Sequence, residues 1–127
     1  MAEKALVEAD LGKSEKIVAA LEAADIRVAV ALWAVLPEYG DWRLVLASRD
    51  LDGLSLGDAY LKVDGALRDS GLTVWETPTI FIMKTTDPFV KALRRVYGKA
   101  RSLIGMRLGG QTWGDRYVED AFAYKIA

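Results

Sequence analysis

The 127-residue sequence contains no cysteine and no histidine, and each absence excludes a kind of chemistry. Without cysteine, the chain has no disulfide, no thiolate nucleophile and no sulfur ligand for a metal ion. Without histidine, it has no imidazole to take the proton of a catalytic serine or to bind zinc. Because disulfide-free chains are typical of reducing compartments, the sequence predicts a cytoplasmic protein.

Long hydrophobic runs and a strong net charge are also missing. The longest apolar run, residues 28–36, is nine residues long, whereas a membrane-spanning helix needs about 20, so we expect no membrane association. The formal net charge is −1, which gives no general attraction to nucleic acid. Residues 1–64 nevertheless carry seven basic and twelve acidic residues, and residues 65–127 carry ten basic and six acidic ones. This asymmetry favours an oriented contact with a partner or a second copy of the chain.

The sequence is rich in apolar residues arranged with clear periodicity. Its composition, 52% hydrophobic and 28% charged, is typical of a globular protein, and its length matches a single domain over residues 1–127. Periodicity and turn residues predict helices over 3–24, 55–70 and 88–100, and strands over 27–36, 42–49, 79–84, 103–108 and 117–126. Gly12 predicts a kink or a break in the first helix. The strands over 103–108 and 117–126 are predicted to form a second hairpin around a loop over 109–115. We expect an α+β domain in which three helices pack a mixed, mostly antiparallel five-stranded sheet, in the order α-β-β-α-β-α-β-β.

The two strands over 27–36 and 42–49 are predicted to form an antiparallel hairpin, because the five residues between them include Pro, Gly and Asp. Pairing Leu36 with Trp42 sets which side chains share a face. One face then remains apolar where a solvated face would alternate with polar residues. Either the chain's own helices or a second subunit covers this face, and we favour the helices.

This apolar face supplies the first functional hypothesis. It places Trp33 near Arg43 and Arg49, and tryptophan and arginine are enriched at protein interfaces. We expect a small, non-catalytic protein-interaction module that binds another protein or a second copy of itself as a homodimer. The candidate interface residues are Trp33, Val35, Arg43, Val45 and Arg49.

The helix predicted over 88–100 supplies an alternative. At 100° per residue, five cationic side chains occupy one side of this helix, namely Lys91, Arg94, Arg95, Lys99 and Arg101. Such a stripe is commonly a solvated face, and it is also typical of a surface that contacts phosphate groups. The alternative function is therefore that of a nucleic-acid-associated protein or a small metal-dependent nuclease.

Two further patterns resemble catalytic sites without completing them. Residues 53–57 match the Gly-x-Ser-x-Gly pattern of hydrolases, but the chain offers no histidine base and no Ser-x-x-Lys spacing. Ser55 is instead predicted to cap a helix by accepting a hydrogen bond from the Asp58 backbone N–H. The acidic residues show no metal-ligand spacing. We therefore expect no catalytic residue, metal site or cofactor.

Overall fold

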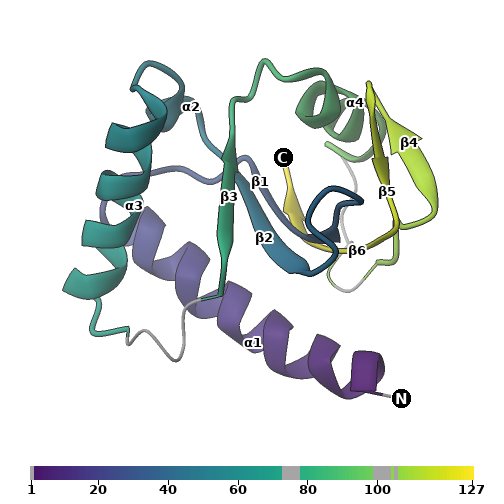
Figure 1. The fold of residues 1–127 in the computed structure, drawn as a ribbon. Coiled ribbons are helices and arrows are strands. Elements are labelled where there is room, and N and C mark those ends of the chain that lie inside the picture. The colour runs from purple at the N-terminus through teal and green to yellow at the C-terminus, as the bar shows by residue number, and fades with distance from the viewer. Residues whose placement is uncertain (1, 73–77, 99–103, 105) are drawn as a thin grey trace.

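The computed structural model describes the backbone of residues 2–72, 78–98, 104 and 106–127, and the side chains of these residues from 12 onwards. It confirms an α+β fold, with four helices and six strands within the described residues (Figure 1). The helices are α1 (Ala2–Ala23), α2 (Arg49–Asp52), α3 (Leu56–Asp69) and α4 (Pro88–Tyr97). The strands are β1 (Val30–Val35), β2 (Trp42–Ala47), β3 (Ile80–Met83), β4 (Gln111–Trp113), β5 (Arg116–Val118) and β6 (Asp120–Ile126).

The strands form a mixed four-stranded sheet in the order β3-β2-β1-β6 and a separate two-stranded sheet, β4-β5. The predicted single sheet of five strands packed by three helices is therefore wrong in detail, and the short helix α2 is the one that the sequence did not indicate. β1 is antiparallel to both β2 and β6, whereas β3 is parallel to β2. The parallel pair is joined through α2 and α3, as expected because a parallel connection needs a crossover that is long enough to return to the same end of the sheet.

The β1–β2 hairpin is confirmed, but its predicted register is wrong by one residue. Val35, not Leu36, pairs with Trp42. Because side chains alternate along a strand, this single step moves one strand's side chains to the other face relative to the prediction. Trp33 therefore shares a face with Leu44, and Val45 lies on the opposite face.

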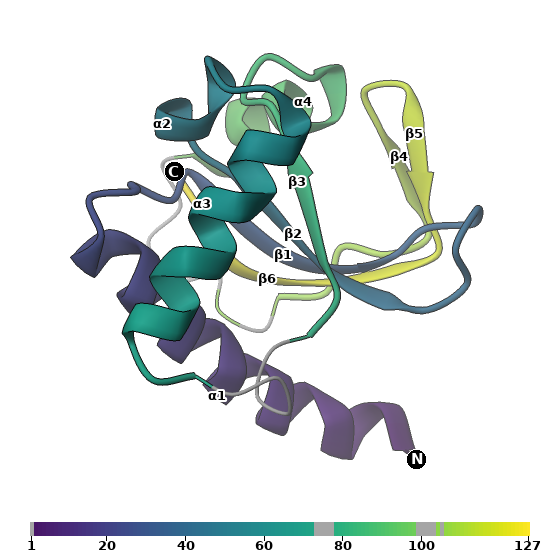
Figure 2. The same ribbon diagram turned by 60° about the vertical axis from the view of Figure 1, so that its left-hand side comes forward.

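One face of the sheet is covered by α1 and α3 (Figures 1 and 2). The cluster that fills this layer includes Ile17 and Leu21 of α1, Val63 of α3 and Trp33 of β1. Trp33 is only 3% exposed, and its indole Nε1–H donates a hydrogen bond to the buried Ser14 hydroxyl. α1 runs through Gly12 as one helix, so the predicted break there is wrong.

The opposite face is covered by α4 and the β4–β5 hairpin. Phe89 and Leu93 of α4 are completely buried there. The hairpin turn lies against the start of α4, because a Cβ added to Gly114 would lie 2.5 Å from the Pro88 carbonyl carbon and oxygen. Gly114 also has a φ of +63°, which glycine adopts readily. Both faces of the sheet are thus covered by this chain's own elements.

The C-terminal part differs most from the sequence prediction. The predicted loop over 109–115 contains β4, which pairs with β5. Part of the predicted 103–108 strand does pair with β6, through one bridge between Arg107 and Phe122 and backbone hydrogen bonds on either side. The Arg107 guanidinium also binds the Asp120 carboxylate. Leu103 and the last residues of the helix predicted over 88–100 lie outside the described residues.

β3 forms one edge of the four-stranded sheet, and α3 supplies a side chain to it. The Tyr60 hydroxyl donates to the Ile80 carbonyl oxygen at 3.3 Å and accepts from the Ile82 backbone N–H at 3.1 Å. These backbone groups point away from β2, so Tyr60 satisfies part of the edge that strands otherwise leave open. None of the described helices combines the length and apolar character that a bilayer crossing requires.

Candidate functional site

The five residues predicted as an interface do not form one surface. Trp33 is buried under α1 and α3, and Val45 is completely buried under α4. Val35 is half-buried at the end of β1, and Arg43 is half-buried and binds Asp41. Arg49 alone is well exposed.

The cations predicted on the third helix are partly brought together. Lys91 and Arg95 are exposed on α4, and Arg94 is half-buried beside them. Lys99 and Arg101 lie outside the described residues. The described cations of α4 face away from its buried residues, as the predicted stripe requires.

These cations adjoin two others from distant parts of the sequence. An open hollow of about 230 Å³, here called the Arg27 hollow, is lined by Arg27, Val28, Ala29, Arg49, Arg94 and Ala127. A second, of about 420 Å³ and here called the Lys91 hollow, is lined by Lys91, Arg94, Arg95, Gly98 and Ala127. Arg94 and Ala127 belong to both. We call the five cations, Arg27, Arg49, Lys91, Arg94 and Arg95, the basic surface.

The fold explains this convergence. Arg27 follows a turn in which Asp25 has a φ of +63°, and Arg49 follows Ser48, whose hydroxyl caps α2. The Ala127 N–H donates to the Ala29 carbonyl oxygen at 2.7 Å, which joins the end of β6 to the start of β1. Arg94 then reaches this end of the sheet from α4, and its Nε donates to the Ala127 carbonyl oxygen at 2.6 Å. In Figure 1 the C-terminus accordingly lies beside α4.

Arg27 is the one member of the basic surface with an acidic partner among the described residues. The Asp50 carboxylate accepts from the Arg27 backbone N–H at 2.8 Å and from its side-chain Nε and Nη2 at 3.4 and 3.3 Å. The side-chain hydrogen bond is the largest cause that lowers the pKa of Asp50 and raises the pKa of Arg27. Asp50 thus stays ionised at neutral pH and marks the acidic border of the surface.

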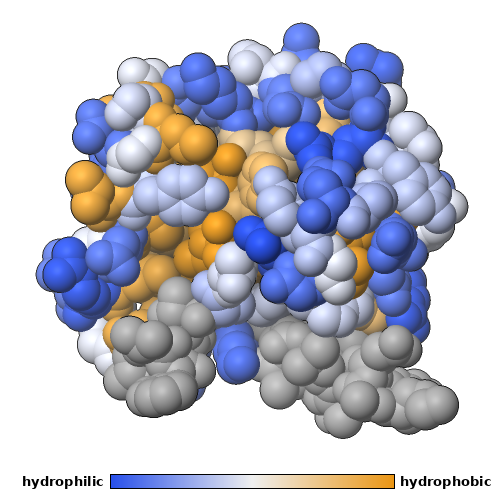
Figure 3. Space-filling model, in the orientation of Figure 1, coloured by the Kyte–Doolittle hydropathy of each residue, from blue (hydrophilic) through white to orange (hydrophobic). Residues whose placement is uncertain are grey.

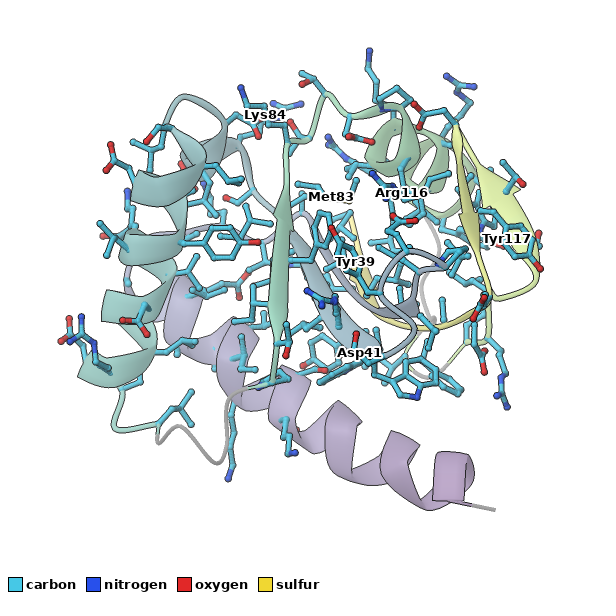
Figure 4. The ribbon with its side chains drawn as sticks, viewed as in Figure 1. Tyr39, Asp41, Met83, Lys84, Arg116 and Tyr117 are labelled. Carbon is cyan, nitrogen blue, oxygen red and sulfur yellow. The ribbon has the colours of Figure 1, made fainter. Side chains whose placement is uncertain are left out.

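No acidic side chain in the described part of the chain pairs with the other four cations or lines either hollow, although Arg94 Nε donates to the Ala127 main-chain oxygen. The arginines near the opposite end of β2 differ, because they are paired with acidic side chains. Arg43 binds Asp41 and stacks 3.8 Å above the Tyr39 ring, and Arg116 binds Glu38. Figure 4 shows Tyr39, Asp41 and Arg116 in this second cluster. Its charges are compensated, whereas Arg49, Lys91, Arg94 and Arg95 of the basic surface meet no acidic side chain among the described residues and can contact an external anion.

The Gly-x-Ser-x-Gly pattern has a structural role, and the acidic residues that the structure describes do not gather at one place. Ser55 caps α3 and accepts from the Asp58 N–H at 3.2 Å, as predicted. In the described ranges, no group of three or more acidic residues is placed to hold a metal ion.

Comparison of the chain with protein families, curated proteins and solved structures gives no match. The functional argument therefore rests on the basic surface itself. Sequence reasoning identified its α4 cations and, for a different role, Arg49. It missed Arg27, because nothing in the sequence around residue 27 indicates that the turn before β1 meets α4.

Proposed function

We propose that this chain binds nucleic acid and that the basic surface contacts the phosphate groups. The observation that carries the proposal is the meeting of five cations from three separate segments, four of them without an acidic partner in the described residues. Like charges repel, so such a grouping costs folding free energy that a bound anion offsets.

The shape of the surface favours a polymer over an enclosed small molecule. Small-molecule sites are concave and mostly apolar, and they bury most of the ligand. The two hollows are open and cationic, and they adjoin each other through Arg94 and Ala127. A chain of phosphates can follow such a surface while its bases stay in solvent.

The proposal is tested by the salt dependence of oligonucleotide binding. Each phosphate neutralised by a cation contributes about −0.7 to the slope of log K against log salt for a single strand. Four available cations therefore predict a slope near −3, and Arg94→Gln with Arg95→Gln should reduce its magnitude by about 1.4. Fluorescence anisotropy with a labelled single strand measures both values.

The matched control changes the same charge on another face. Lys16 on α1 and Arg68 on α3 are exposed and line neither hollow, and Lys16→Gln with Arg68→Gln should leave the slope unchanged. Absence of binding at low salt would overturn the proposal. An equal loss in the control pair would do the same, because it would show that only net charge matters.

Self-association is the second candidate, with a second copy of the chain as the partner. The observation in its favour is the apolar surface around the start of α3, where Leu56 and Leu61 are 62% and 67% exposed. Leu56 also lines a small hollow with Leu54 and Ile82, and Figure 3 shows hydrophobic residues gathered over α3 and β3. Exposed apolar patches often mark interfaces, and a two-fold dimer brings the same patch together from both copies.

Light scattering tests this candidate. A dimer that Leu56→Lys dissociates, while Val96→Lys on the exposed side of α4 does not, would support it. A monomer at high micromolar concentration would exclude it.

A further inference from the structure

We propose that the Arg27 hollow binds a phosphate monoester at the end of a nucleic-acid strand, so that the chain recognises phosphorylated strand ends. This inference rests on the function proposed above. It adds a specific ligand group and a direction to the general contact with phosphates.

Three arginines from separate segments of the chain line the Arg27 hollow. Arg27, Arg49 and Arg94 line one hollow of about 230 Å³ and come from the α1–β1 turn, the β2–α2 junction and α4. Arginine presents a planar fork of N–H donors that matches phosphate oxygens in pairs. A terminal phosphate carries a charge of about −1.5 to −2 and three acceptor oxygens, whereas a phosphodiester carries a single charge. Arg49 and Arg94, together with the Arg27 donors that do not bind Asp50, match the monoester better than the diester.

Hydrogen bonds hold several residues that line the Arg27 hollow in place. Val28, Ala29 and Ala127 form part of its lining. Ala29 donates to the Ala47 carbonyl oxygen at 2.8 Å, and Ala127 donates to Ala29. The hydrogen bond from Arg94 Nε to the Ala127 oxygen also holds that guanidinium in place. A site whose donors are already positioned binds with a smaller loss of side-chain entropy.

The two sides of the Arg27 hollow differ in charge. On one side it continues through Arg94 into the Lys91 hollow, where Lys91 and Arg95 can contact further phosphates. On the other side stands Asp50, whose side chain is 24% exposed and bound to Arg27. A strand that continued past Arg27 would bring its next phosphate towards this carboxylate, and like charges repel. The strand can therefore enter along α4 and end at Arg27.

The experiment compares one oligonucleotide sequence in three forms: with a 5′-phosphate, with a 3′-phosphate, and with hydroxyl groups at both ends. We expect one phosphorylated form to bind about tenfold more tightly than the hydroxyl form, a difference of about 1.4 kcal/mol. Arg49→Gln should remove this preference while the hydroxyl form still binds. Lys91→Gln should weaken all three forms by the same factor, because it contacts only internal phosphates. Circular dichroism confirms that both variants are folded.

The outcomes separate the two proposals. If no form binds, the proposed nucleic-acid function fails. If all three bind equally, that function stands and the end-recognition inference is overturned. A nucleoside monophosphate tests the remaining source of the same chemical group. In a competition experiment, the labelled phosphorylated strand is displaced either by the nucleoside monophosphate or by the same strand without a label. If both competitors act at the same concentration, the hollow is a small-molecule site and the inference is again overturned.

Discussion

The hydrogen bond between Trp33 and Ser14 predicts a clear loss of stability when the serine is replaced. Both side chains are buried, Ser14 completely and Trp33 to all but 3%. Ser14→Ala would leave the indole N–H without its acceptor in the layer between α1 and the sheet. If Trp33 acted mainly as an interface residue, this change would have little effect on the free energy of unfolding.

The expected magnitude follows from two opposing contributions. A buried donor left without an acceptor costs about 1–3 kcal/mol. Alanine in place of serine within a helix returns up to about 0.5 kcal/mol. The free energy of unfolding should therefore fall by about 1.5 kcal/mol, which corresponds to a melting temperature lower by about 6 °C for a chain of this size.

Urea unfolding followed by far-UV circular dichroism measures this change, and a double-mutant cycle assigns it to the pair. In the Trp33→Phe background there is no indole N–H, so Ser14→Ala should cost about 1 kcal/mol less than in the wild type. Ser70→Ala, at the exposed end of α3, is the control and should be neutral. Equal costs of Ser14→Ala in the two backgrounds would refute the reasoning.

Three further predictions follow from single contacts. Tyr60→Phe removes the hydroxyl that satisfies two backbone groups of β3; it should cost about 1–2 kcal/mol and speed hydrogen exchange at this strand, whereas Tyr117→Phe, which is 48% exposed, should change neither. Gly114→Ala places a methyl group against the first turn of α4 and should lower stability more than Gly110→Ala, which has the same sign of φ but open space around it; thermal melts compare the two. The hydrogen bond from Arg107 is the main cause that lowers the pKa of Asp120. The contribution of the Asp120 carboxylate to stability is therefore complete above the ordinary aspartate pKa of about 4 and is lost as pH falls through the lowered value. Unfolding measured across acid pH should show the difference in stability between wild type and Asp120→Asn closing below about pH 4.

Local sequence signals predicted the individual elements well. Ser55 caps its helix as predicted, and the five residues before Trp42 lie in the turn of an antiparallel hairpin. Each of these features depends on interactions within a few residues, which spacing and residue type reveal directly. The α+β class followed from the order of such elements.

Pairing between elements was harder to predict, because it depends on geometry that spacing does not contain. Both strands of the first hairpin are apolar on both sides, so no polar residue fixed their register and a one-residue error resulted. The short strand β4 lies in the segment predicted as a loop, which contains three glycines and an aspartate, and most of β5 lies in the predicted 117–126 strand. That strand is predicted to pair with the 103–108 segment, although the main partner of β6 is β1, about 90 residues away.

The basic surface shows why the net charge of −1 is a poor guide to the local distribution of charge. Arg27 and Arg49 belong to the acidic half of the sequence and Lys91, Arg94 and Arg95 to the basic half, yet the fold brings all five to one end of the sheet. Several exposed acids lie on α1 and α3, at Glu15, Glu22, Asp58, Asp64 and Asp69, although Asp25 is also exposed two residues before Arg27. A polyanion is therefore attracted to the end of the sheet where the five cations meet and repelled by the acidic surfaces of these helices. Under the proposed function, such a separation orients the approach of a strand to a protein without a large net charge, and association should depend on salt while most of the protein surface stays free of nucleic acid.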